Sequence, residues 1–163
     1  MRICFFGDSF VHGTGDDDAL GWVGWLTARA RREGCDVTAY NLGVRRNTSA
    51  DVAARWKTEA ASRLSPENDG RLVFSFGAND CALGMTRTES LAHAEAILDS
   101  ARRWLPTLMI GPGIIADSPE VSDSPAWSRE ALLGDGAHPS GGGYTIIADA
   151  VASWTAWREW MRQ

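Results

Sequence analysis

Two short segments of this chain contain the nucleophile, base and carboxylate that nucleophilic acyl transfer requires. Ser9 follows Gly7-Asp8 at the end of an apolar run, and its hydroxyl is placed to act as a nucleophile. A serine hydroxyl is weak near neutral pH and needs a base, for which His138 is the candidate. Asp135 precedes His138 by three residues, so its carboxylate can hold one ring nitrogen and leave the other facing Ser9. The sequence therefore predicts a catalytic triad of Ser9, His138 and Asp135.

Acyl transfer also requires hydrogen-bond donors for the oxyanion of the tetrahedral intermediate. Gly43 ends a second apolar run, and the absence of a side chain lets its backbone N–H approach a ligand closely. Asn79 follows a third apolar run that ends at Gly77, and it supplies a side-chain amide. The Ser9 N–H is the third donor. We therefore expect an oxyanion hole formed by Ser9, Gly43 and Asn79.

The segments between these residues alternate between strand and helix patterns. Short apolar runs predict four strands, at residues 2–6, 37–42, 72–76 and 107–110. Apolar residues at steps of three and four predict helices at 21–33, from 47 or 48 to 64, at 86–105 and from 139 or 140 onward, with a short helix at 127–133. Thr86 and Glu89 have capping-box spacing, which indicates where the third helix begins.

Alternating strands and helices of this length are typical of a parallel sheet with helices on both faces, the doubly wound α/β class. Ligands of such sheets bind beyond the carboxyl ends of the strands. We therefore expect the turns at 7–10, 43–47 and 77–81 to converge in space although they are far apart in the sequence.

Ser9, Gly43, Asn79 and His138, each in its local motif and in this order, resemble the four blocks of the SGNH hydrolases, also called GDSL esterases and lipases. The resemblance spans most of the chain. It implies a flavodoxin-like three-layer α/β/α sandwich with a parallel sheet of four to five strands. It also implies that Ser9 is the nucleophile, that Gly43 and Asn79 form the oxyanion hole, and that Asp135 and His138 complete the triad. Carboxylic esters, thioesters, lysophospholipids or acetylated sugars are the implied substrates, with no metal or other cofactor.

The sequence leaves the physiological substrate open. A small acyl ester with a short acyl chain such as acetyl is expected, because the loops after the first three strands are brief. An acyltransferase, a thioesterase or a lysophospholipase would use the same triad. A catalytically silent binding module is disfavoured by the intact triad. A phosphate-binding protein is disfavoured because no lysine follows Gly13.

Other polar residues near these motifs have simpler explanations. His12 is a rival base, but at the end of a first helical turn it is expected to point along the helix or the pocket rim. His93 is expected at the surface, and Cys81 as a small buried thiol. Asp8 and Asp80 are expected to accept hydrogen bonds from backbone amides of their loops.

The composition excludes several classes of protein. With 163 residues, of which 44% are apolar, we expect one hydrolase domain over residues 1–163. A net charge of -5 offers no basic surface for nucleic acid. Three separated cysteines favour neither a disulfide framework nor a zinc site. No apolar run is long enough for stable membrane insertion and no signal sequence is evident, which favours a cytoplasmic enzyme. A single lysine, Lys57, among 16 basic residues suggests a GC-rich bacterial genome.

Two regions leave the number of strands in the sheet and the oligomeric state of the protein open. Residues 111–134 have no clear strand pattern, although the family resemblance implies a further helix and strand there. We expect that such a segment is missing near Glu120; the alternative is a four-stranded sheet whose edge is covered by a loop or a partner subunit. Near the carboxyl end, three tryptophans predict a packing stripe or a dimer contact, which leaves a homo-oligomer open: Trp154, Trp157 and Trp160.

Overall fold

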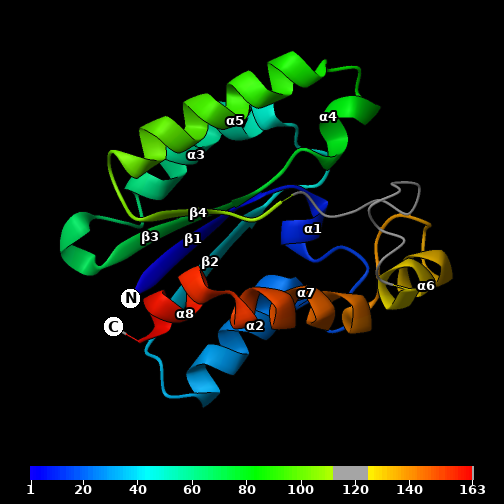
Figure 1. Ribbon diagram of the computed structural model, residues 1–163, viewed down its shortest axis with the longest axis horizontal. Coiled ribbons are helices and arrows are strands. Elements are labelled where there is room, and N and C mark those ends of the chain that lie inside the picture. The colour runs from blue at the N-terminus through cyan, green and yellow to red at the C-terminus, as the bar shows by residue number, and fades with distance from the viewer. Residues whose placement is uncertain (112–124, 163) are drawn as a thin grey trace. The chain divides into compact units, whose positions relative to one another are not determined.

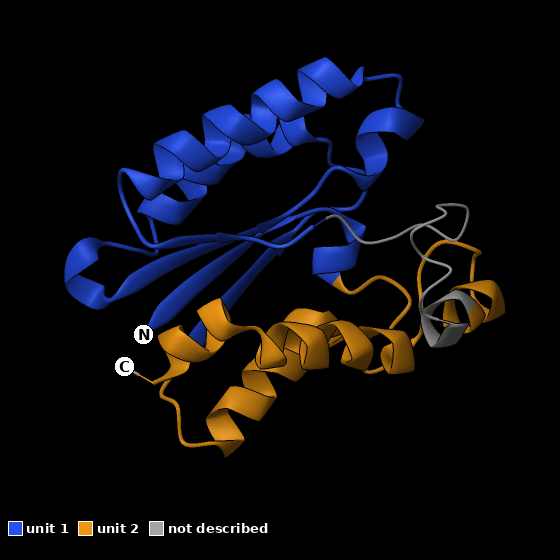
Figure 2. Cartoon of the chain, in the orientation of Figure 1, with its two compact units in different colours: residues 1–12, 38–113 blue, residues 13–37, 114–163 orange. Residues whose placement is uncertain are grey.

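A computed structural model describes residues 1–111 and 125–162 (Figure 1). The chain forms two compact units, one from Met1–His12 and Thr38–Gly113 and the other from Gly13–Val37 and Ile114–Gln163 (Figure 2). The segment near Glu120, where the sequence predicts a missing helix and strand, lies outside the described residues.

The first unit contains a parallel sheet of four strands. These are β1 (Arg2–Gly7), β2 (Thr38–Gly43), β3 (Gly70–Ser75) and β4 (Thr107–Met109), arranged in the order β2-β1-β3-β4. In this register Gly7 is paired with Gly43 on one side and with Ser75 on the other. The carboxyl ends of the three longer strands therefore lie side by side. This confirms the predicted parallel sheet, with strand ends that differ from the predicted ones by one or two residues.

Two long helices of the first unit begin at capping boxes. α3 (Ser49–Ala61) begins after Thr48, which exchanges hydrogen bonds with Asp51, and α5 (Arg87–Arg102) begins after Thr86, which does the same with Glu89. These starts confirm the predicted ones. α1 (Ser9–His12) is the helical turn expected after Ser9, whereas η1 (Pro66–Asn68) and α4 (Ala78–Ala82) were not predicted. Segments of three to five residues are too short to show a helical period.

The core of the first unit lies between the sheet and helices α3 and α5, which cover one of its faces (Figure 1). Phe74 of β3 is at its centre, stacked on Phe6 with ring centroids 5.5 Å apart and in edge contact with Trp56 at 5.6 Å. Cys4 is fully buried in this core, and burial raises the pKa of its thiol to about 12, so the thiol stays protonated and unreactive. The apolar face predicted for the second helix is buried: Val52, Trp56, Ala60 and Leu64.

The described part of the second unit is helical. α2 (Gly21–Arg32) packs against α7 (Gly141–Ser153), and α7 also contacts α6 (Pro125–Leu133) and α8 (Thr155–Met161). α7 begins after its N-cap Ser140, as predicted. Trp157 and Trp160 are buried, with ring centroids 6.2 Å apart, which confirms a packing role for these two, whereas Trp154 is exposed and does not share it. None of the helices in the described part of the chain is long and apolar enough to cross a membrane.

Candidate active site

Ser9 stands at the start of α1, directly after β1, in a turn that requires Gly7. A Cβ atom on Gly7 would lie 1.9 Å from the Ser75 carbonyl oxygen, so no larger residue fits there. Asp8 closes the turn: its Oδ1 accepts the Phe10 N–H at 3.0 Å and its carbonyl oxygen accepts the His12 N–H at 3.0 Å. This confirms the amide-binding role predicted for Asp8. Ser9 is thereby held at the carboxyl end of β1, where it is 5% exposed.

The end of β2 is packed tightly against the helix that carries Ser9. A Cβ atom on Gly43 would lie 2.2 Å from the His12 backbone nitrogen, so the close approach of α1 to β2 depends on this glycine. The Asn41 side chain joins the same two elements, because its Nδ2 donates to the Val11 carbonyl at 2.7 Å. Its Oδ1 accepts the Gly43 N–H at 3.0 Å. The N–H that the sequence assigns to the oxyanion hole thus has an acceptor within the protein.

Asn79 lies on α4, which begins after Gly77 with a positive φ of 118°. Its side-chain Nδ2 donates to the Asn47 carbonyl oxygen at 3.0 Å. Nδ2 carries two hydrogens, so this bond leaves one of them for another acceptor. The loop before α3 therefore orients the Asn79 amide.

The neighbouring Asp80 anchors α4. Its side chain is buried, its Oδ1 accepts the Ser49 N–H at 2.7 Å, and its Oδ2 accepts the Ser90 hydroxyl. This confirms that Asp80 binds a backbone amide, and it shows that this carboxylate ties α4 to both α3 and α5. Sequence reasoning did not find these partners, which lie 31 and 10 residues away along the chain.

Two expectations about neighbouring residues are corrected. His93 is half-buried rather than on the open surface, and its Nδ1 lies 3.1 Å from the Ser49 hydroxyl. Cys81 is exposed rather than buried, because the short helix α4 turns it away from the core. His12, the rival base, is exposed at the end of α1.

In the second unit, Asp135 and His138 form the pair that their spacing predicts. Asp135 Oδ2 lies 2.7 Å from His138 Nδ1, while Oδ1 accepts the N–H groups of Ala137 at 3.0 Å and His138 at 2.8 Å. Hydrogen bonds hold the pKa of Asp135 well below its usual range. The bond from the His138 backbone N–H contributes most, followed by the bond from the His138 ring. An ionised carboxylate can only accept a hydrogen bond, so His138 Nδ1 carries the proton in this pair. When the His138 ring is neutral, its lone pair is therefore on Nε2.

The loop after α1 supports the histidine turn. A Cβ atom on Gly15 would lie 2.8 Å from the Pro139 carbonyl oxygen and 3.2 Å from His138 Cβ, so this loop is in close contact with the turn. Asp16 orders the loop by accepting the Gly21 N–H at 2.8 Å and the Trp25 indole N–H at 3.2 Å. Sequence reasoning missed both supporting residues.

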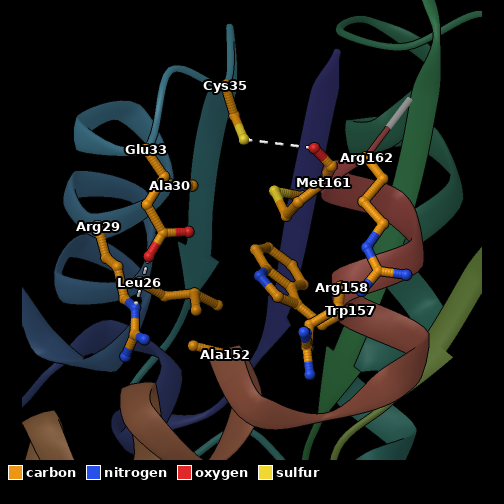
Figure 3. Close-up of a pocket in the computed structure, with 10 residues that line it drawn as sticks. All are labelled: Leu26, Arg29, Ala30, Glu33, Cys35, Ala152, Trp157, Arg158, Met161 and Arg162. Atoms are coloured by element: carbon orange, nitrogen blue, oxygen red, sulfur yellow. Dashed lines mark hydrogen bonds and ion pairs between the residues drawn. The ribbon is translucent and has the colours of Figure 1, made fainter.

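A separate pocket of about 260 Å³ lies in the second unit between α2 and α8 (Figure 3). Arg29 at its rim is already paired with Glu33 at 3.1 Å and with Asp149 at 2.9 Å, and the Cys35 thiol donates to the Met161 carbonyl. None of the predicted catalytic residues lines this pocket. No group of three or more His, Cys, Asp or Glu side chains in the described ranges is arranged to hold a metal ion.

The sequence profile of the GDSL-like lipase/acylhydrolase family matches residues 5–132. The chain belongs to this family. The match confirms the family resemblance and shows that the protein is a hydrolase of the GDSL type. The match ends before Asp135, so the Asp135–His138 pair rests on its own geometry.

Solved structures of similar fold include TesA, with a TM-score of 0.76, 20% sequence identity, and coverage of 98% of this chain and 99% of that chain. The psychrotrophic esterase EstA from Pseudoalteromonas sp. has a TM-score of 0.73 and 17% identity, with 99% of both chains covered. The acetylxylan esterase Axe2 from Geobacillus stearothermophilus has a TM-score of 0.69 and 17% identity, with 98% and 93% covered. At these identities the likeness shows the SGNH hydrolase fold. Among curated proteins, none matches this sequence.

Proposed function

We propose that this GDSL hydrolase is a serine esterase that cleaves small carboxylic esters through an acyl-enzyme on Ser9. The observation that carries the proposal is the Asp135–His138 pair, in which a carboxylate 2.7 Å from Nδ1 selects the ring tautomer that can accept a proton at Nε2. The order of the Ser9, Gly43, Asn79 and His138 motifs along the chain supports the assignment of His138 to Ser9.

The proposed reaction has two halves. Ser9 Oγ attacks the ester carbonyl carbon while His138 Nε2 takes the hydroxyl proton, and the carbonyl oxygen becomes an oxyanion. His138 then gives the proton to the leaving alcohol as the bond between the carbonyl carbon and the alcohol oxygen breaks. In the second half, water attacks the acyl-enzyme with His138 again as base, which releases the carboxylic acid and restores Ser9.

The oxyanion donors in this proposal are the Ser9 N–H, the Asn79 side chain and the Gly43 N–H. Asn79 is the best supported of the three, because its second Nδ2 hydrogen remains after the bond to Asn47. Gly43 must share its N–H with Asn41 Oδ1 or exchange that acceptor for the oxyanion. Its close contact with α1 also gives it a packing role.

We further propose that short acyl groups such as acetyl are preferred. Only residues 44–48 connect β2 to α3, which leaves little chain at this strand end to line a long acyl channel. The similarity in fold to an acetylxylan esterase supports an acetyl ester as the first substrate to test.

A fluorophosphonate probe tests the nucleophile, and a series of esters tests the substrate. We expect the probe to modify Ser9, as located by peptide mass spectrometry, and to leave the Ser9→Ala variant unmodified. We also expect kcat/KM for p-nitrophenyl acetate to exceed that for the octanoate below micelle-forming concentration. Modification of another residue would refute the assignment of Ser9, whereas faster octanoate turnover would refute only the acyl preference. Transfer of the acyl group to an added alcohol in preference to water would identify an acyltransferase.

A further inference from the structure

Arg55 on α3 contacts the ends of two strands at the edge of the sheet that carries Ser9. Its Nη2 donates to the Gly7 carbonyl at 3.1 Å and to the Leu42 carbonyl at 2.9 Å. Its Nε donates to Asn47 Oδ1 at 2.8 Å. The side chain is 19% exposed, so these charge-assisted bonds are largely shielded from solvent.

Each of the three residues that accept from Arg55 is close in sequence, or hydrogen-bonded, to a residue of the proposed acyl-transfer site. Gly7 precedes Ser9 by two residues, and Leu42 directly precedes Gly43. Asn47 holds Asn79 through its own backbone carbonyl oxygen. One guanidinium therefore connects the turns that carry the nucleophile and the oxyanion donors.

The orientation of this guanidinium is itself restrained. Glu59, one helical turn further along α3, accepts from Arg55 Nη1 at 3.2 Å. Arg55 Cζ also lies 5.8 Å from the centroid of the Phe6 ring, within the range of a cation–π contact. Only arginine has a planar fork of donors that can reach acceptors on several sides, because a lysine ammonium is a compact single centre.

The turn that Arg55 supports contains a strained residue. The Asn47 N–H donates to the Val44 carbonyl at 3.1 Å, and Arg46 within this turn has a φ of 67°, which costs a non-glycine residue conformational energy. Without the bond from Arg55 to its side chain, Asn47 would lose a restraint at the point where it orients the Asn79 amide.

We propose that Arg55 is a positioning residue for acyl transfer: it keeps the Ser9 turn and the Asn79 amide in the arrangement that stabilises the oxyanion. Arg55 does not contact the substrate in this proposal. The inference rests on the proposed roles of Ser9 and Asn79. Loss of the Arg55 side chain is expected to lower kcat more than it raises KM, because displaced donors weaken binding of the transition state rather than binding of the ground state.

The test compares Arg55→Ala and Arg55→Lys with Arg63→Ala, an arginine just after the end of α3 that donates hydrogen bonds to Glu59 and Ser62. We expect kcat to fall roughly 10- to 100-fold in both Arg55 variants with KM within about threefold of the native value. Guanidinium ion added to Arg55→Ala should restore part of the lost kcat. Arg63→Ala should keep the native kcat and show no response to guanidinium.

A double-mutant cycle shows whether Arg55 acts through Asn79. In an Asn79→Ala background the further loss from Arg55→Ala should be several-fold smaller than in the native protein, because the orientation of that amide no longer matters. Additive losses, or a native kcat in both Arg55 variants, would overturn the inference. If Arg55→Ala does not fold, Arg55→Lys and Asn47→Ala replace it, and a native kcat in both would overturn the inference equally.

The two proposals fail in different ways. A native protein in which the fluorophosphonate probe does not modify Ser9 contradicts the proposed function. A native protein modified at Ser9, together with Arg55 variants that retain kcat, contradicts only the positioning role.

Discussion

Replacing Asp135 by asparagine separates the proposed catalytic role of this carboxylate from its structural one. The asparagine side chain would keep the oxygen that accepts the N–H groups of Ala137 at 3.0 Å and His138 at 2.8 Å, so the turn should remain closed. Only the atom 2.7 Å from His138 Nδ1 changes, from an acceptor oxygen to a donor NH2 group. The perturbation is therefore confined to the tautomer of the histidine ring.

The expected loss of activity in Asp135→Asn follows from the change in the tautomer of His138. A donor opposite Nδ1 favours the imidazole that carries its proton on Nε2, and this ring cannot accept the Ser9 proton. The same change in a serine protease triad lowers kcat by about 10⁴-fold. We expect a similar loss in kcat/KM here, which corresponds to about 5 kcal/mol of transition-state stabilisation. The thermal unfolding midpoint should change little, since both backbone hydrogen bonds persist.

The assay is hydrolysis of p-nitrophenyl acetate by the native protein, Asp135→Asn and a control, Asp99→Asn, which makes the same charge change on the exposed side of α5. Asp99→Asn should retain native turnover. Turnover by Asp135→Asn within tenfold of native, with an unchanged unfolding midpoint, would refute the assignment of Asp135 as the residue that orients His138.

Three further predictions concern the oxyanion donor, the strained turn and acid stability. Asn79→Ala should lower kcat by roughly 100- to 1000-fold without loss of folding, and unchanged turnover would remove this amide from the site. Arg46→Gly should raise the unfolding free energy by about 1 kcal/mol because it removes the cost of a φ of 67°, whereas Arg45→Gly, measured by the same urea titration, should not. The unfolding free energy should fall as the pH drops below about 4.5, because hydrogen bonds lower the folded pKa values of Asp51 and Glu89 from 3.8 and 4.5, and stability from such groups is lost on protonation. An unfolding midpoint that stays constant from pH 6 to pH 3 would contradict this.

Features that depend on a few neighbouring residues could be predicted from the sequence. The capping boxes at Thr48 and Thr86 begin helices because the partners are three residues away and meet in any helical first turn. The Asp135–His138 contact has the same cause, because a tight turn brings side chains three residues apart together. The apolar runs predicted the four strands, and the helices between the strands predicted that the strands are parallel.

Short helices without a period were beyond prediction. η1 and α4 have three and five residues, less than two helical turns, and the exposure of Cys81 follows from where α4 turns the chain. The half-buried position of His93 likewise depends on Ser49, which lies 44 residues away on another helix.

The arrangement around the strand ends was decided by tertiary structure alone. Arg55 reaches the Gly7 carbonyl across 48 residues, and Asn41 reaches Val11 across 30, because the parallel register places the ends of β1 and β2 side by side. Gly43 shows the same dependence: its position in the sequence indicated a candidate oxyanion donor, while the packing of α1 against β2 revealed that a Cβ there would meet the His12 backbone. Residue types and short spacings thus determined which chemistry this chain can perform, because those contacts are local. The partners that hold its groups in place were determined by strand register and helix packing, which bring together residues that are distant in the sequence.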